Sequence, residues 1–520
     1  MSVSARRPTG RPGGRTGNQR RPRDLARRTA FDVLHAVDAR GAYANLLLPS
    51  LLRDRHLDPR DAALATELTY GALRGRGTYD AVLALCSDRP LAEIDPPLRD
   101  VLRLGAHQLL ATRIPPHAAV SATVDLARRV TGDGPARFAN AVLRRVAARD
   151  LDAWMEIAAP PETDDPIGRL AILHSHPRWV VEALRDALAA APAQPDTAPA
   201  QPGAASTQPG AAPTRPEAAN TQPGAASAQS GDASALLGAG GELAALLAAD
   251  NERPRVTLAA KPGRSDRNEL VAGGAEPARY SPHGAYLIEG DPAQVLAVKQ
   301  RRATVQDEAS QLIAAALAGL GRRRDGERWL DMCAGPGGKS ALLSGLARDG
   351  GARLLAADAQ EHRAGLVARA VARSGTARAV VADGTRPAWR SGAFDRVLVD
   401  APCTGLGALR RRPEARWRRG PDSVPELAAL QRRLLDAAVD AARPDGVIAY
   451  VTCTPVLAET REVVDAVRAD RPDLEVLDAP AALRDVAVGD LDLGDGPYAQ
   501  FWPHRHGTDA MFCALLRRTA

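Results

Sequence analysis

Trp329-Leu-Asp-Met-Cys-Ala-Gly-Pro-Gly-Gly-Lys-Ser340 is the stretch that decides the expected fold. A short apolar run leads directly into a glycine-rich turn, and a helical pattern begins where the turn ends. In sheets that alternate strands with helices, the first turn of this kind usually cradles a ligand beyond the carboxyl ends of the strands. The stretch therefore predicts an α/β fold and places a binding site within it.

The rest of the C-terminal part repeats this rhythm. Short apolar runs alternate with helical patterns, which is typical of βαβ units and a mostly parallel sheet. The expected strands cover residues 329–332, 353–357, 379–382, 396–399 and 447–451, with an edge pair near 511–516. We predict a doubly wound, Rossmann-like α/β domain over residues 301–520.

The glycine-rich turn excludes two common nucleotide sites. Its glycines lack the spacing of the dinucleotide fingerprint, and a P-loop would need a glycine at Cys333. A tight turn that admits a compact ligand with an amino-acid end fits better. Asp358 and Asp383 follow the next two strands and can accept hydrogen bonds from ribose hydroxyls and from an exocyclic amine, although each alone would more often be a helix cap or a surface residue. Together they favour S-adenosylmethionine. Lys339, after the turn, is either a required compact ammonium or a solvated charge.

Two cysteines stand at the ends of apolar runs, Cys403 in Asp400-Ala-Pro-Cys403 and Cys453 in Thr452-Cys-Thr454. One such cysteine is more often packing, but two favour covalent chemistry. C5 of cytosine is a poor nucleophile, and a thiolate that adds at C6 turns the ring into an enamine able to attack a sulfonium methyl. The site also needs an acid near N3, an acceptor for the C5 proton and a base held out of its stack. Cys453, Asp400 and Cys403 can supply the three protein groups between them.

The nucleophilic thiol must be activated, because a free thiol has a pKa of ~8.5. Basic residues follow Cys403 at Arg410, Arg411, Arg412, Arg416, Arg418 and Arg419. They could raise the local potential and grip phosphates. A charged run is usually a solvated face, but the interleaved Pro413 and Trp417 favour an ordered basic loop at the mouth of the site.

Four further segments precede this domain. Residues 24–150 carry apolar residues at three- and four-residue steps, which predicts an all-α domain. Residues 151–190 predict a helical connector, and residues 241–300 a small α+β module. Residues 1–23 are rich in Arg, Gly and Pro and predict a disordered tail suited to phosphate contact. Residues 191–240 contain a seven-residue Pro/Gly/Ala repeat, which predicts a flexible linker.

Composition narrows the class of protein. The chain has 520 residues, of which 45% are hydrophobic and 25% charged, and its net charge of +6 is unevenly spread, as a polyanion partner would favour. It has no run of the ~20 apolar residues that a membrane helix needs. Its five cysteines form no C-x-x-C pair, so we expect reduced thiols and no metal site, with Cys86, Cys333 and Cys513 packed. A cytoplasmic monomer that does not bind membranes is expected.

Four segments together resemble one known family: residues 305–311, 331–340, 400–414 and 450–454. They are similar to the Fmu/Sun (NOL1/NOP2/Sun) family of RNA cytosine-C5 methyltransferases. Residues 24–150 resemble the NusB-like RNA-binding domain, so the nearest pattern is the bacterial RsmB type, which modifies small-subunit ribosomal RNA. The resemblance implies a SAM-dependent methyltransferase acting on 16S rRNA, with an all-α NusB-like domain and a small α+β module before the catalytic domain.

The resemblance also assigns roles to residues. It implies that Cys453 is the nucleophile and that Cys403 serves product release. The implied cofactor contacts are Cys333, Ala334, Gly335, Pro336, Gly337, Gly338, Lys339, Asp358, Asp383 and Asp400. Residues 256–260 lack the Arg and Asn usual after that strand, which puts RNA contacts of the small module in doubt.

Two alternatives remain open. The same chemistry could act on tRNA or on another rRNA cytosine. The chain could also be a non-catalytic RNA-binding assembly factor, although a scaffold has no need of two thiols.

Overall fold

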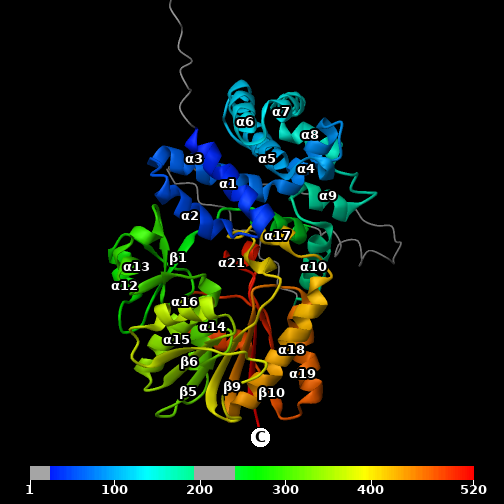
Figure 1. Ribbon diagram of the computed structural model, residues 1–520. Coiled ribbons are helices and arrows are strands. Elements are labelled where there is room, and N and C mark those ends of the chain that lie inside the picture. The colour runs from blue at the N-terminus through cyan, green and yellow to red at the C-terminus, as the bar shows by residue number, and fades with distance from the viewer. Residues whose placement is uncertain (1–23, 192–240) are drawn as a thin grey trace, which may run out of the picture.

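The computed structural model describes residues 24–191 and 241–520. The predicted Arg-rich tail and nearly all of the predicted repeat linker lie outside these residues. A helical part stands over the carboxyl-end region of a large sheet, and a small sheet lies beside both (Figure 1). Within the described ranges, no helix is long and apolar enough to cross a bilayer.

The N-terminal part is all-helical, as predicted. Its helices are α1 (Leu25–Arg40), α2 (Ala44–Asp54), α3 (Pro59–Arg74), α4 (Arg76–Cys86), α5 (Pro96–Ala111), α6 (Pro116–Thr131) and α7 (Asp133–Val146), with a 3₁₀ turn η1 (Leu91–Glu93). Proline occupies the first position of α3, α5 and α6, where its missing N–H costs nothing. Helix α5 is buried along most of its length and forms the centre of one shared apolar core.

The connector consists of α8 (Leu151–Ala158), α9 (Pro166–Leu173) and α10 (Arg178–Ala189). A helix over 241–249 joins it. Its Leu243, Leu246 and Leu247 are buried against Val180 and Leu184 of α10. The prediction that the small module begins at residue 241 therefore differs from the structure, because this apolar face packs on the connector and not on the small sheet.

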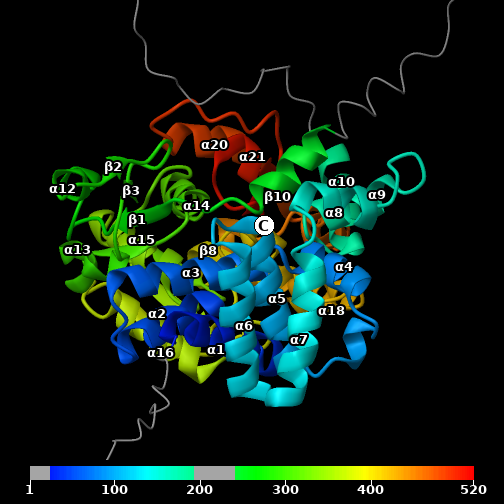
Figure 2. The same ribbon diagram turned by 90° about the horizontal axis from the view of Figure 1, so that it is seen from above.

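The small module is an antiparallel sheet in the order β2-β3-β1-β4. Its elements are β1 (Val256–Ala260), α12 (Arg267–Ala272), β2 (Glu276–Pro277), β3 (Gly284–Leu287), η2 (Pro292–Gln294), α13 (Leu296–Lys299) and β4 (Ala303–Val305). Ala303 pairs with Ala260, so the sheet continues past the predicted boundary at residue 300. The small sheet and α8 to α10 lie on opposite flanks of the molecule (Figures 1 and 2).

The large sheet has the order β10-β12-β9-β8-β5-β6-β7, with β11 paired to β12. Its strands are β5 (Arg328–Asp331), β6 (Arg353–Asp358), β7 (Ala377–Val381), β8 (Phe394–Asp400), β9 (Ala442–Thr452), β10 (Leu474–Leu477), β11 (Ala499–Gln500) and β12 (Phe512–Arg518). Strands β5 to β9 run parallel, which confirms the predicted α/β class. Strand β12 is not at the edge: it lies between β9 and β10, and its Cys513 is fully buried.

Helices cover both faces of this sheet. They are α14 (Glu308–Gly319), α15 (Gly338–Asp349), α16 (Glu361–Val371), α18 (Ser423–Ala441), α19 (Arg461–Asp470) and α20 (Ala479–Val486). Two shorter helices of the same part are α17 (Ala415–Arg418) and α21 (Pro503–His506). Neighbouring residues of one strand enter different cores: Trp329 packs with α14 and α15, whereas Leu330 packs with α18. The strand order reverses between β5 and β8, and ligands bind at such a point beyond the carboxyl ends.

Candidate active site

The two thiols predicted to carry chemistry meet beyond the carboxyl ends of β8 and β9. Asp400 pairs with Val451 in the parallel register of these strands, so the Cys403 and Cys453 loops leave the sheet side by side. Their sulfur atoms are 3.3 Å apart, and both are free thiols of intermediate exposure. Strand pairing thus joins residues that are 50 positions apart in the sequence.

The two thiols differ in protonation. The hydrogen bond from Cys403 lowers the pKa of Cys453, and the charges of Lys339 and Arg412 act in the same direction against burial and Asp400. The same hydrogen bond, together with burial, raises the pKa of Cys403 well above its ordinary value. These shifts make Cys453 the more acidic thiol of the pair, which is the arrangement that a nucleophile at Cys453 requires.

Lys339 is the cation nearest to this chemistry. Its Nζ lies 2.8 Å from Asp400 Oδ2, and its side chain is 9% exposed. Burial lowers the pKa of Lys339, but the charge and hydrogen bond of Asp400 outweigh it, so the ammonium has a raised pKa and stays charged. The sequence left two interpretations of Lys339, a compact ammonium that the site requires or a solvated charge. The buried ion pair matches the first interpretation.

We expect Lys339→Met to shift the acid limb of the pH–kcat profile to higher pH. An attack by Cys453, as the sequence predicts, needs its thiolate, so activity should be lost as pH falls through the Cys453 pKa. Lys339 lowers that pKa, and its removal raises it. The measurement is kcat against pH at saturating cofactor and RNA. Lys299→Met, at an exposed position of α13, is the control, and an unshifted acid limb in Lys339→Met would contradict the role of Lys339.

The glycine-rich turn is held against β6. Ala334 N donates to Ala357 O at 2.9 Å, and Gly335 N donates to Asp358 Oδ2 at 3.0 Å. Gly337 has a φ of 109° and begins α15; a Cβ on it would lie 2.8 Å from Ala370 Cβ. The backbone can fold this tightly only because Gly335 and Gly337 carry no side chain.

The carboxylates at the next strand ends lie where the sequence places them. Asp358 is almost fully buried and accepts from the N–H groups of Gly335 and Gln360, so it shapes the turn as well as facing it. Asp383 is exposed and accepts hydrogen bonds from the N–H and the hydroxyl of Thr385. The bond from the N–H, followed by the bond from the hydroxyl, lowers the pKa of Asp383. Both carboxylates keep lone pairs for a nucleoside.

Two buried side chains beside the turn keep polar atoms without a partner in the described part of the chain, and sequence reasoning missed both. For Gln306 these are both amide atoms, and a Cβ on Gly338 would lie 3.7 Å from Gln306 Cδ. Asp331 accepts from Ser340 Oγ at 2.5 Å through Oδ2, whereas its Oδ1 has no partner among these residues, and burial raises its pKa to about 7. Unpaired buried polar atoms fit a polar ligand at this turn, as S-adenosylmethionine would be. Both residues lie in segments that resemble the family, 305–311 and 331–340, and this position could have indicated them as site residues.

Glu459, in η4 (Leu457–Glu459), is a further residue that the sequence did not indicate. It is fully buried, and burial raises its pKa. Its carboxylate accepts from Thr404 N at 2.8 Å, from Thr404 Oγ1 at 2.5 Å and from Gln431 Nε2 at 3.1 Å. Thr404 Oγ1 lies 2.9 Å from Thr454 Oγ1. Glu459 thereby ties together the residues that follow each thiol.

Gly407 lies where the Cys403 loop crosses the backbone after Cys453. Its N–H donates to Cys453 O at 2.9 Å, and its carbonyl accepts from Ala510 N at 2.8 Å. A Cβ on Gly407 would lie 1.9 Å from Ala510 O and 2.9 Å from Cys453 O. Any side chain here must move backbone that positions the nucleophile.

We expect Gly407→Ala to lower kcat by about a hundredfold, since a misplacement of about 1 Å can have that effect. The free energy of unfolding should fall by about 1–3 kcal/mol through overpacking. Initial rates and denaturant unfolding measure the two effects. The matched control is Gly365→Ala in α16, where a Cβ meets nothing within 4 Å. Equal activities of both variants would show that the crossing tolerates a side chain.

The sequence predicts phosphate contacts for the arginines after Cys403, and for Arg416 this is wrong. Arg416 is fully buried and donates to Ser175 O and to Asn251 Oδ1, both at 2.9 Å. Arg418 donates to the carbonyls of Gly41 and Ala42 in the N-terminal helical part. These side chains join the catalytic part to the connector and to the helical part because backbone carbonyls there need donors.

Arg412 matches the prediction better. Arg410 donates to the Gly507 carbonyl and Arg411 forms an ion pair with Asp509, but among the described residues Arg412 has no hydrogen-bond acceptor. Its guanidinium lies 5.5 Å from the ring centroid of Tyr43, and its charge lowers the pKa of Cys453. Arg412 thus remains available to raise the potential at the site.

Two family matches cover the N-terminal helices and the large sheet. The family described as 16S rRNA methyltransferase RsmB/F matches residues 320–517, and the NusB family matches residues 24–148. Ribosomal RNA small subunit methyltransferase B of Sodalis glossinidius is 32% identical over 461 residues, which cover 87% of this chain and 90% of that protein. The chain belongs to the RsmB/F family. As a member of the RsmB/F family it is a SAM-dependent rRNA methyltransferase.

Other similarities extend over nearly the whole length of this RsmB/F family member. A Mycobacterium tuberculosis protein named as a candidate methyltransferase, Rv1407, is 48% identical over 504 residues, 96% of this chain and 98% of that protein. The crystal structure of PH0851 has the same fold, with a TM-score of 0.71 at 19% identity over 95% of this chain and 98% of that one. The predicted NusB-like and Rossmann-like parts are thereby confirmed.

Proposed function

We propose that this RsmB/F family member methylates C5 of a cytosine in 16S rRNA through a covalent bond between Cys453 and C6. The observation that carries the proposal is the thiol pair at 3.3 Å, in which Cys453 has the lowered pKa and Cys403 the raised one. A scaffold protein gains nothing from a buried thiolate, because burial penalises its charge.

The first step uses Cys453, Asp400 and Lys339. The Cys453 thiolate bonds to C6 while N3 of the ring takes a proton from the Lys339–Asp400 ion pair, which takes that proton back when the ring is restored. The ring becomes an enamine whose C5 is nucleophilic. The cofactor supplies an electrophilic methyl group on a sulfonium, and the residues that would hold it are the turn 333–339, Asp358 and Asp383, together with the unpaired amide of Gln306.

Release uses Cys403. The hydrogen bond and negative charge of Cys453 are among the main causes that hold its pKa high. Both are lost once Cys453 is bonded to carbon, so Cys403 can then give its proton to solvent, and the resulting thiolate accepts the C5 proton. The Cys453–C6 bond breaks as that proton leaves, which restores the aromatic ring and the Cys453 thiolate. The two thiols thus act in sequence.

Labelled methyl transfer tests the substrate. The enzyme, with labelled cofactor, would be given free 16S rRNA, assembled small subunits and tRNA, followed by mapping of modified cytosines. We expect 5-methylcytosine at one position of 16S rRNA. Transfer confined to tRNA would contradict the proposed substrate, and no transfer to any RNA would favour the assembly-factor alternative.

A further inference from the structure

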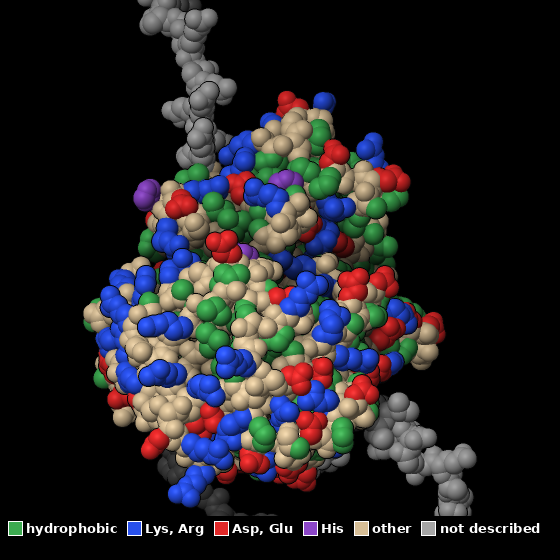
Figure 3. All heavy atoms as spheres, turned by 60° about the horizontal axis from the view of Figure 1, so that its bottom comes forward, with side chains coloured by type: hydrophobic (Ala, Val, Ile, Leu, Met, Phe, Trp, Pro, Cys, Tyr) green, Lys and Arg blue, Asp and Glu red, His purple; other side chains and the backbone are tan. Residues whose placement is uncertain are grey.

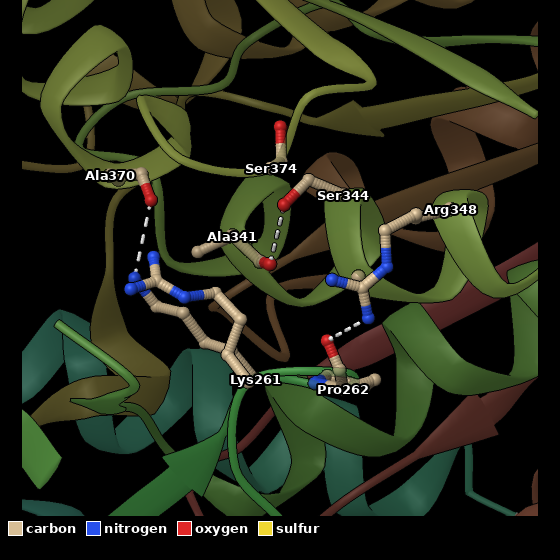
Figure 4. A pocket seen from close by; sticks show the side chains of 9 residues that line it. Lys261, Pro262, Ala341, Ser344, Arg348, Ala370 and Ser374 are labelled. Carbon is tan, nitrogen blue, oxygen red and sulfur yellow. Dashed lines mark hydrogen bonds between the residues drawn. The ribbon is translucent and has the colours of Figure 1, made fainter.

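A pocket outside the active site lies where the loop after β1 meets α15 and α16 (Figure 4). Lys261, Arg264 and Arg348 line it, and Arg373 adjoins its lining residue Ser374. We call these four residues the cationic pocket. Burial and then the charges of Arg373, Arg302 and Arg348 lower the pKa of Arg264, so Arg264 lies within the electrostatic influence of these cations.

Most of this charge has no acidic partner. Arg348 pairs with Asp349 at 2.9 Å, but in the part of the chain that the structure describes no ion pair involves Lys261, Arg264 or Arg373. Lys261 is 8% exposed, and among the described residues its Nζ donates only to the Ala370 carbonyl, at 3.2 Å. Burial, followed by the charges of Arg264 and Arg301, lowers its pKa to about 8. A buried ammonium held by one neutral acceptor is costly unless an anion completes the site.

Two members of the pocket also have an internal role. Lys261 and Arg348 donate to the carbonyls of Ala370 and Pro262, and so fasten the small module to α16 and α15 (Figure 4). Arg264 and Arg373 make no hydrogen bond of this kind among the described residues, and Arg373 is exposed. Fastening the module therefore explains Lys261 and Arg348 but not the other two arginines.

The surroundings extend this basic character. On the flank where the small sheet lies in Figure 1, the face drawn in Figure 3 gathers Lys and Arg side chains with few acidic ones between them. The opposite end of β1 reaches the active site, because Gln306, beside the cofactor turn, donates its N–H to Thr257 O. The pocket thus lies outside the catalytic centre, at the end of β1 opposite to the one that approaches the cofactor turn.

We propose that the cationic pocket binds a phosphodiester of the RNA substrate, with Arg264 and Arg373 in direct contact and Lys261 beneath them. The proposal rests on the proposed function only in that the substrate is RNA. Arginine forks match phosphate oxygens in geometry and charge. Such a contact positions RNA without reading its sequence. It would also give the small module an RNA contact that residues 256–260 by themselves do not offer.

The test is RNA affinity measured against salt concentration for Arg264→Ala/Arg373→Ala. Each phosphate contact contributes about one to the slope of log K against log salt, so we expect the slope to fall by about two, for cognate and unrelated RNA alike. KM for RNA should rise at unchanged kcat. Arg264→Lys/Arg373→Lys, which keeps both charges, should restore most of the slope.

Arg328→Ala/Arg390→Ala is the matched control, since both arginines are exposed: Arg328 begins β5 and Arg390 precedes β8, at the opposite ends of these strands from the active site. An equal loss of slope in control and test variants, or no loss in the test variant, would overturn the proposal. If the double variant does not fold, exposed Arg373→Ala alone should lower the slope by about one. Failure of the proposed function appears separately, as absence of cytosine methylation by the unmodified enzyme.

Discussion

Replacing Cys453 by Ala is expected to abolish methyl transfer, with a loss of at least about a thousandfold in kcat. Without the sulfur, no bond forms at C6 and C5 of cytosine stays a poor nucleophile. The variant should still bind RNA and cofactor, since Cys453 does not fasten the surrounding loops: Glu459 and Thr404 do. Rates with labelled cofactor and denaturing gels for protein–RNA adducts measure both parts of the prediction.

Two further variants sharpen this result. Cys453→Ser keeps the size of the side chain but not the acidity of the thiol, so it should be as inactive as the Ala variant. Cys86→Ala, in the core of the N-terminal helices, removes a sulfur far from the site and should keep wild-type turnover. Turnover near wild type in Cys453→Ala would exclude the covalent route through this residue.

Replacing Cys403 by Ala is expected to trap the enzyme on its RNA as a denaturation-resistant adduct. Attack by Cys453 does not need Cys403, but removal of the C5 proton does, so the reaction should stop after methyl transfer. Loss of the Cys403 hydrogen bond should also raise the pKa of Cys453, since that bond is the largest cause of its lowering. The adduct should therefore form more slowly at neutral pH than at pH 9.

The double variant Cys403→Ala/Cys453→Ala provides the control. It should form no adduct, which would assign the trapped bond to Cys453. If Cys403→Ala turns over normally without adduct, release proceeds through another base. If it is inactive without adduct, Cys403 acts before or during attack, and the separation of roles is wrong.

Much of the fold could be predicted from the sequence, because the spacing of apolar residues along the chain differs between strands and helices. The apolar runs at 329–332, 396–399 and 447–451 are the central strands of the sheet, and the helical steps of residues 24–150 are helices. The sequence suggests an edge position for β12, but the strand lies between β9 and β10. An apolar run shows that a strand is buried but does not show which strands pair with it. The helix over 241–249 was misassigned because its leucines show that a face is buried, but not against what.

The sequence by itself determined the chemical groups of this protein: two thiols, a glycine turn of fixed shape and carboxylates after several strands. Only the tertiary structure decided how the two thiols differ. Parallel pairing of β8 with β9 sets the sulfur atoms 3.3 Å apart, and the hydrogen bond between them moves their pKa values in opposite directions. Lys339, through its ion pair with Asp400, and Glu459, through its hydrogen bonds with Thr404, shape the surroundings of the thiol pair. The guanidinium of Arg416 is occupied by hydrogen bonds to the connector. Protonation and availability depend on burial and neighbouring charge, which arise only when distant segments meet.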